Sequence, residues 1–218
     1  MDIKFYPGSE AVYFNTEPPL SAKELVPKWY KDIKPDEQLN VKNCIPFLDT
    51  LSYGYIQTTW ADIHVEKGID RPTISCNGLP QLFSIRDNSD IQVNDSFYRI
   101  EFVWHRSWSV QLPEGYSGLV THPLNRLDLP FTTLSGVVDF DQYHHSKFGN
   151  IPFYLNKDFE GVIPKGTPIF QIMPIKREDW NSYKEEYDKD SWKEKEDKRT
   201  SIKTGSYKKL FWQRKSFK

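Results

Sequence analysis

The stretch LPEGYSGLVTHPLNRLDLPFTTLSGVVDFDQYHHSKFGNIPFYLNKDFEGVIPKGTPIFQIMPI, residues 112–175, decides the fold class. Short runs of β-branched and aromatic residues alternate in it with turn residues such as Gly, Pro, Asn and Asp. Runs of the same kind, separated by turn signals about every eight to twelve residues, extend back to about residue 44. No helical pattern lies between them. We therefore expect a mainly β domain, a jelly-roll-like sandwich or barrel, over residues 44–175.

The first 43 residues are expected to form an N-terminal arm. Its run AVYFN, residues 11–15, predicts a short strand and is followed by two prolines. Ser21 and Glu24 then fit a capping box, the reciprocal hydrogen-bonding pattern that starts many helices. The arm is therefore predicted to carry one short capped helix outside the β domain.

Residues 176–218 are expected to form a charged C-terminal region. Trp180, Tyr183 and Tyr187 fall at helical spacing in a stretch without Gly or Pro, which predicts an amphipathic helix that docks an aromatic stripe. Residues 205–218 carry five basic and no acidic residues among several aromatics. Such a tail could grip a nucleic-acid strand, but we expect it to pack its rings on the domain and to expose its lysines.

The composition narrows the classes of function. The 218 residues carry a formal net charge of −1, so no global field attracts nucleic acid. No run of about 18 apolar residues is present, and the first residues, MDIKFYPGSE, lack the layout of a secretory signal. Two cysteines, Cys44 and Cys76, make no disulfide framework, which favours a reducing, intracellular location. We expect neither a membrane nor a nucleic acid as partner.

The stretch GVVDFDQY contains two aspartates that could carry chemistry. On a strand, Asp139 and Asp141 point to the same face, about 7 Å apart at their Cβ atoms. Two carboxylates this close repel each other unless water, a cation or a hydrogen-bond donor compensates them. General-base catalysis and cation binding both meet that demand. A solvated strand end that leads into a turn meets it equally well.

A second candidate is the Pro-bounded loop HPLNRLDLPF. Asn125 and Arg126 lie in it, and an arginine is suited to bidentate contacts with phosphate oxygens. Alternatively, Arg126 and Asp128 simply tie the loop together.

The five histidines do not form a metal motif. His144 and His145 are adjacent and would face opposite ways on a strand, while the other three are scattered. We therefore expect no dedicated metal site. The cofactor is unknown, and a magnesium ion carried in with a phosphate ligand stays open.

These motifs, in this order, resemble the central part of the trimeric deoxyuridine triphosphatase (dUTPase) and deoxycytidine triphosphate deaminase superfamily. The matching residues are Gly115 and Tyr116, residues 136–139 with Asp141 and Tyr143, residues 151–156, and Lys165, Gly166, Ile169 and Gln171. By this resemblance Asp139 orients the attacking water, Tyr143 lies under the base and sugar, and Gln171 contacts phosphate. The resemblance also implies a dUTPase-like fold and a trimer whose pockets are shared between chains. It covers under a third of the chain.

The chain departs from that pattern where phosphate would be bound. Thr121, His122 and Pro123 stand where the family has an Arg-Ser-Gly loop, and one extra residue separates Asp141 from Tyr143. No arginine follows that tyrosine, and a charged, aromatic tail replaces the family's Gly-rich phosphate arm. The loss of these groups argues against triphosphate hydrolysis, because that reaction depends on positioning and charge stabilisation.

The whole chain also resembles a family of proteins found largely in tailed bacteriophages. The resemblance runs through the stretches PKWYKDIKP, VKNCIPFLD, GYIQTTWADIHV and IPKGTPIFQIMPIKRE. It implies a viral origin, and hence a location in the cytoplasm of the infected bacterial host, but no mechanism.

Three functions remain open. The first, which we favour, is a non-catalytic phage protein that binds a nucleotide-like small molecule, for example to sequester a nucleotide signal of host defence. Its ligand-binding residues would be Asn125, Arg126, Asp139, Asp141, Tyr143 and Gln171. The second is a nucleotide hydrolase or deaminase that uses Asp139 as its base. The third is a structural or interaction protein that assembles through aromatic-rich surfaces.

Overall fold

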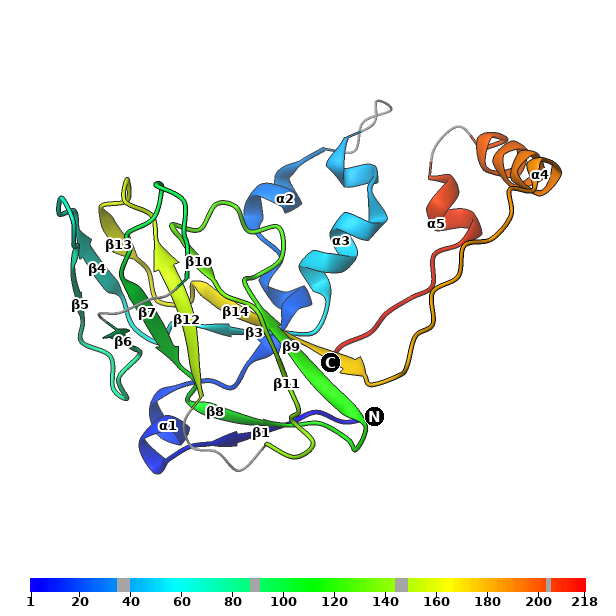
Figure 1. Cartoon of the computed structure of the whole chain (residues 1–218). Coiled ribbons are helices and arrows are strands. Elements are labelled where there is room, and N and C mark those ends of the chain that lie inside the picture. Colours follow the sequence, from blue (N-terminus) through cyan, green and yellow to red (C-terminus); the bar gives the residue numbers. More distant parts are fainter. Residues whose placement is uncertain (35–39, 87–90, 144–148, 203–204) are drawn as a thin grey trace.

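The computed structural model describes residues 1–34, 40–86, 91–143, 149–202 and 205–218. Its body consists of antiparallel sheets, with short helices on one side and a C-terminal extension that arches away (Figure 1). The strands are β1 (Lys4–Pro7), β2 (Leu20–Ser21), β3 (Tyr55–Thr58), β4 (Ile63–Glu66), β5 (Thr73–Cys76), β6 (Phe83–Arg86), β7 (Glu101–His105), β8 (Trp108–Gln111), β9 (Tyr116–Thr121), β10 (Phe131–Thr133), β11 (Gly136–Val138), β12 (Asn150–Leu155), β13 (Gly161–Ile163) and β14 (Pro168–Lys176). The helices are α1 (Glu10–Asn15), α2 (Lys28–Asp32), α3 (Ile45–Ser52), α4 (Lys189–Thr200) and α5 (Ser206–Leu210), with 3₁₀ turns η1 (Ala22–Leu25) and η2 (Val41–Asn43). The predicted mainly β class is confirmed.

The longest strand, β14, lies in the middle of a five-stranded sheet with the order β11-β9-β14-β3-β2. A register shift between Pro168 and Phe170 interrupts its pairing with β3. Because a bulge inserts one residue, Ile169 reaches the same core as Phe170 and Ile172. Gln171 points to the opposite face, toward the end of α3. Because both faces of β14 are covered in this way, its first six residues are all buried.

Three other sheets also pack side chains into the core. Their strand orders are β10-β12-β7-β6, β13-β4-β5 and β1-β8. At the centre, Trp104 of β7 stacks on Phe153 of β12, with ring centres 3.6 Å apart and planes 6° apart. The Trp104 indole N–H is satisfied because it donates a hydrogen bond to Thr133 Oγ1 at 3.1 Å. Aromatic residues make up 15% of the sequence, and part of them is thus used to pack the core.

The N-terminal region corrects two sequence predictions. Residues 11–15 form helix α1 rather than a strand, because the Ser9 side chain caps the first turn by accepting from the Val12 N–H at 3.3 Å. The capping box is also wrong, since Ser21 precedes a 3₁₀ turn and its hydroxyl donates to the Phe217 carbonyl at 2.9 Å. Strand β1 pairs with β8, so the first residues belong to the β body.

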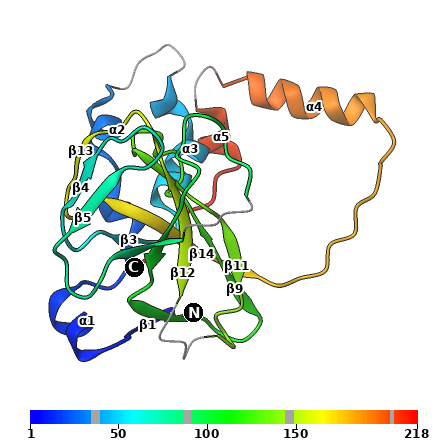
Figure 2. The ribbon, with the colours of Figure 1, turned by 60° about the vertical axis from the view of Figure 1, so that its left-hand side comes forward.

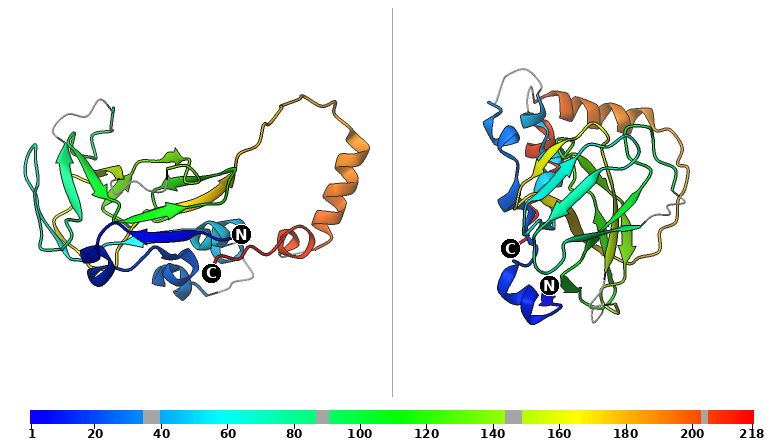
Figure 3. Two further views of the ribbon diagram at one scale, coloured as in Figure 1. Left: turned by 90° about the horizontal axis from the view of Figure 1, so that it is seen from below. Right: turned by 90° about the vertical axis from the view of Figure 1, so that its left-hand side faces the viewer.

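The C-terminal region contains the predicted charged helix, but not the predicted aromatic stripe. Trp180, Tyr183 and Tyr187 lie before the helix in an extended segment and are 86%, 80% and 76% exposed. Helix α4 begins only after Asp188, whose carboxylate accepts from two backbone N–H groups of its first turn. We call residues 178–188 the strap. Figures 2 and 3 show it leaving β14 and arching away from the sheets.

After the strap and α4, residues 205–218, which we call the tail, return to the body. Phe217 lies 4.4 Å from Tyr53 between ring centres, and the Trp212 indole N–H donates to the Asp49 carboxylate. The expectation that the tail packs its rings on the domain is confirmed for these two aromatics. In the described part of the chain, every helix is too short or too polar to cross a bilayer. The division of the chain at residues 43/44 and 175/176 stays a prediction.

Candidate functional site

Asp139 and Asp141 lie beyond the end of β11, and one arginine compensates both. Arg177, the residue after β14, places Nη1 3.2 Å from Asp139 Oδ1 and 3.0 Å from Asp141 Oδ1, while its Nη2 also contacts Asp141. Ser117 of β9 donates a hydrogen bond to Asp139 Oδ1 at 2.6 Å. The aspartates therefore lie together around a guanidinium that the chain itself supplies.

The two carboxylates differ in exposure and role. The Asp139 side chain is 61% exposed, whereas that of Asp141 is 2% exposed. Asp141 also accepts from the backbone N–H of Gly115 at 3.0 Å, where a φ of +81° favours glycine. The hydrogen bond from Arg177 lowers the pKa of Asp141 to about 2. Asp141 is thus an ionised anchor at the base of the strap, while Asp139 stays accessible to solvent.

Both polar atoms of the Gln171 side chain form hydrogen bonds. Its side chain is 1% exposed. Its Oε1 accepts from the Leu124 N–H at 2.8 Å, and its Nε2 donates to the carbonyls of Thr50 at 3.1 Å and Tyr53 at 2.5 Å. Those carbonyls lie at and just after the C-terminal end of α3, where a helix leaves acceptors without intrahelical partners. Gln171 therefore joins β14, α3 and the loop after β9.

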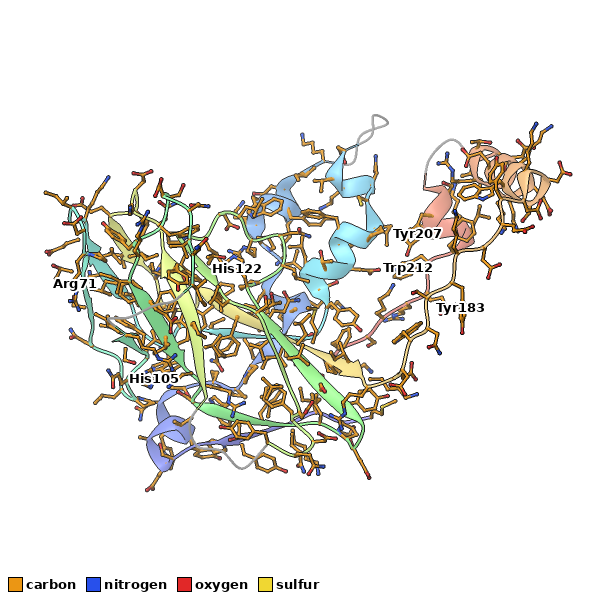
Figure 4. All side chains as sticks on the ribbon, in the orientation of Figure 1. Arg71, His105, His122, Tyr183, Tyr207 and Trp212 are labelled. Atoms are coloured by element: carbon orange, nitrogen blue, oxygen red, sulfur yellow. The ribbon has the colours of Figure 1, made fainter. Side chains whose placement is uncertain are left out.

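The loop that contains Asn125 and Arg126 is also attached to the C-terminal end of α3. Asn125 adopts a φ of 59° and its Nδ2 donates to Thr50 Oγ1 at 2.5 Å. Arg126 forms a bidentate pair with Asp128 at 2.8 and 2.9 Å, so these two residues tie the loop together. His122, labelled in Figure 4, bonds to the Arg126 carbonyl at 3.1 Å, and burial lowers its pKa. A phosphate contact by Asn125 or Arg126 stays a prediction.

The structure does not bring the six predicted ligand residues together. In the register of β9 with β14, Thr121 pairs with Gln171, and Ser117 pairs with Ile175. The loop and Gln171 therefore meet one end of β9 and the aspartate pair meets the other, about 13 Å away along the strand. Tyr143 lies at a third place, in the wall of a cavity.

That cavity, of about 250 Å³, lies between β11 and β12, and we call it the β11–β12 cavity. Its polar lining includes Arg106, Ser135, Tyr143 and Asn150. The Arg106 guanidinium lies 5.2 Å from the ring centre of Phe140 and 5.9 Å from that of Tyr143. Burial lowers the pKa of Arg106, but an arginine keeps its charge at neutral pH. An aromatic ring and a partly desolvated cation therefore share one small cavity.

Strand β11 supplies a further feature of this cavity. Among the described residues it pairs with β9 alone, which makes it the edge of its sheet. An edge strand presents backbone N–H and C=O groups that a planar ligand can bind. The adjacent His144 and His145, whose role was considered from sequence, lie outside the described residues.

Two arginines of these sites were missed from sequence. Arg106 stands in the apolar run FVWHRSWSV, and a cation in a buried strand pattern needs a partner or a function, so this signal was available. Arg177 meets Asp141 across 36 residues, and nothing local in the sequence indicates that pairing.

Magnesium binding by the aspartate pair competes with Arg177. Oxygen ligands suit magnesium, but the guanidinium contacts both carboxylates and supplies the positive charge that a cation would bring. In the described residues, no three His, Cys, Asp or Glu side chains gather as metal ligands. The pair therefore does not fit a resident magnesium ion while Arg177 is in place.

Comparisons with known proteins return structures and no sequence family. No family model matches the chain, and no curated protein matches it. A dUTPase from phage phi11 of S. aureus is similar at 15% identity and a TM-score of 0.40, over 87% of this chain and 99% of that one. The dUTPase of Staphylococcus bacteriophage 80alpha is similar at 14% identity and a TM-score of 0.38, over 86% of this chain and 97% of that one.

Both of these structures are of phage dUTPases. At this identity and TM-score the likeness carries no argument about what the chain binds or whether it turns a ligand over.

Proposed function

We propose that the chain is a phage protein that binds a nucleotide-like small molecule in the β11–β12 cavity and releases it unaltered. The observation that carries this proposal is the meeting of the Tyr143 ring and the Arg106 guanidinium in one cavity. A base can stack on the ring, and the guanidinium suits phosphate oxygens. The edge of β11 offers backbone groups to the rim of the base.

The electrostatics of the aspartate pair support binding without turnover. A general base must reach the proton that it removes. Asp139 is not part of the cavity lining, and Arg177 together with Ser117 engages its Oδ1 atom. The exposed second oxygen keeps a hydrolase or deaminase as the alternative, with Asp139 as its base.

The sequence also gives expectations about location, oligomeric state and magnesium, which belong to the same proposed function. The chain would act in the cytoplasm of an infected bacterium, as a homo-oligomer and by analogy a trimer, and could sequester a nucleotide signal of host defence. Magnesium would enter with the phosphates of the ligand and would not reside in the protein.

The test is a thermal-shift screen against nucleotides and cyclic dinucleotides. A ligand at about 100 times its Kd stabilises the folded state by about 2.7 kcal/mol, which corresponds to a shift of about 5–10 °C for a chain of this size. Tyr143→Ala should weaken binding by about 10–100-fold, because base stacking on an aromatic ring contributes about 1–3 kcal/mol. Tyr187→Ala is the matched control, because Tyr187 lies 76% exposed on the strap.

Recovery of the bound ligand after denaturation separates the alternatives. Unaltered ligand supports the proposal. Product that accumulates in the wild type and is lost in Asp139→Asn would establish the enzyme instead. A shift that Y143A and Y187A both retain would show that the ligand binds elsewhere. No shift with any member of the panel would favour a structural role.

A further inference from the structure

A second cavity, of about 320 Å³, lies where three distant segments of the chain meet, and we call it the tail cavity. Its walls come from η1 and the residue after it, from α3, and from the tail. In Figure 1 the tail runs from α5 back to the body below α3. The tail cavity shares no lining residue with the β11–β12 cavity.

The tail is fixed against the body by specific contacts, so the cavity has defined walls. The Trp212 indole N–H donates to the two oxygens of Asp49 at 3.2 and 3.0 Å, and Figure 4 shows Trp212 on the side of the tail that faces α3. Lys215 Nζ binds the same carboxylate at 2.7 Å. At the far end, the Tyr55 hydroxyl donates to the main-chain oxygen of Lys218 at 3.1 Å.

The side chains that line this cavity carry more positive than negative charge. Four cationic side chains that line it, Lys23, Lys208, Arg214 and Lys218, form no ion pair with any described residue. The side-chain carboxylate among the lining residues belongs to Asp49, and it is already engaged by Lys215 and Trp212. This excess of positive charge occurs in a protein whose formal net charge is −1.

The cavity also has an apolar floor. Val26, Ile45 and Leu48 form it together with the rings of Trp212 and Phe217. The four cationic side chains at its rim are exposed to solvent, so each contact that they make with an anion is that of a surface charge. Unpaired like charges gathered there repel one another, and an anion that bridges them relieves this repulsion.

We propose that the tail cavity is a binding site for a small polyanion that carries two or more phosphate groups. The four cations that form no ion pair among the described residues come from two segments, one from η1 and three from the tail, so a compact anion with several charged oxygens can bridge them. Arginine supplies a bidentate phosphate contact and the lysines supply point charges. This site is independent of the nucleotide-binding proposal for the β11–β12 cavity.

The experiment is isothermal titration of the full chain with inorganic tripolyphosphate at constant ionic strength. Tripolyphosphate has no base, so it does not report on stacking against Tyr143. The double variant Lys23→Gln with Arg214→Gln should bind about tenfold more weakly, since exposed charge pairs are each worth up to about 1 kcal/mol. The control Lys193→Gln with Lys195→Gln removes the same charge from α4, outside the cavity, and should bind like the wild type. Tyr143→Ala should also bind like the wild type.

Three results would overturn the proposal. The first is no heat of binding with the wild type at millimolar tripolyphosphate. The second is an equal loss in both double variants, because general charge attraction would then explain the binding. The third is tighter binding of a single-stranded oligonucleotide than of tripolyphosphate, with the oligonucleotide binding lost in K23Q/R214Q. That result would assign the tail to nucleic-acid binding. Unchanged melting temperatures of the variants verify that they fold.

Discussion

Replacing Gln171 by methionine distinguishes a structural role of this residue from the phosphate contact that the family resemblance implies. The side chain is 1% exposed and both of its polar atoms are engaged. Methionine is similarly long and flexible but brings no comparable donor or acceptor. The change therefore keeps most of the volume and leaves the Leu124 N–H and the carbonyls of Thr50 and Tyr53 without that partner.

The magnitude follows from these three groups. A buried polar group that loses its partner costs about 1–3 kcal/mol, and the lower half of that range is apt here because the three groups are partly buried. The expected loss in the free energy of unfolding is about 3–6 kcal/mol. For a chain of this size each kcal/mol lowers the melting temperature by about 2–4 °C, so we expect a decrease of about 6–24 °C. Urea unfolding at constant m-value measures the free energy directly.

The matched control is Gln142→Met, because Gln142 is an exposed glutamine. It should change stability by less than about 0.5 kcal/mol. A Q171M protein as stable as the wild type would refute the structural role. If that stable protein also failed to bind its nucleotide, the phosphate contact implied by the resemblance would be the better account.

Two further predictions concern the aspartate pair and the packing behind it. Arg177→Gln removes the group that holds the pKa of Asp141 at about 2, below its ordinary value of 3.8. Because the folded-state pKa is the lower one, the pair stabilises the protein above about pH 4, and this contribution is lost as the pH falls from about 4 toward 2. Urea midpoints measured across that window should fall less steeply in R177Q than in the wild type, and parallel curves would contradict the pairing. Gly118→Ala places a Cβ atom 2.4 Å from the buried Phe140 ring and should cost about 1–3 kcal/mol in urea unfolding, whereas Gly136→Ala meets nothing within 4 Å and should be near neutral. Equal stabilities of G118A and G136A would show that Phe140 is not packed against β9.

Most strands could be predicted from sequence because their signal is local. The runs at residues 150–156 and 167–175 lie in the stretch whose short β-branched and aromatic runs predict strands, and they form β12 and β14. Alternation of side chains and turn residues at the ends of each run specify such strands without knowledge of their partners. The pairing order of the sheets depends on contacts between distant residues, and periodicity carries no information on it.

The errors at both ends have a common physical cause. Ser9 caps α1 and Asp188 caps α4, and in both places a single hydrogen-bonding side chain decides where the helix begins. The spacing of Trp180, Tyr183 and Tyr187 indicated a helical stripe, but a stripe forms a helix only when a surface covers it. In the structure these three rings are exposed, and no such surface is provided within the described chain.

The candidate site was predictable in part. Strand geometry indicated that Asp139 and Asp141 need a compensating group, but not that Arg177 supplies it. The resemblance singled out Tyr143, which lines the β11–β12 cavity. Its neighbour Arg106 directly follows β7, and the fold brings it to the cavity although the two residues are 37 positions apart in the sequence. Long-range pairing of this kind leaves no pattern in a single sequence.

The most direct measurement of the central claim is a crystal structure of the protein with a nucleotide that raises its melting temperature. The account predicts intact ligand between β11 and β12, with its base against the Tyr143 ring and its phosphate beside the Arg106 guanidinium. Ligand bound at any other place, or a hydrolysed ligand beside Asp139, would contradict it.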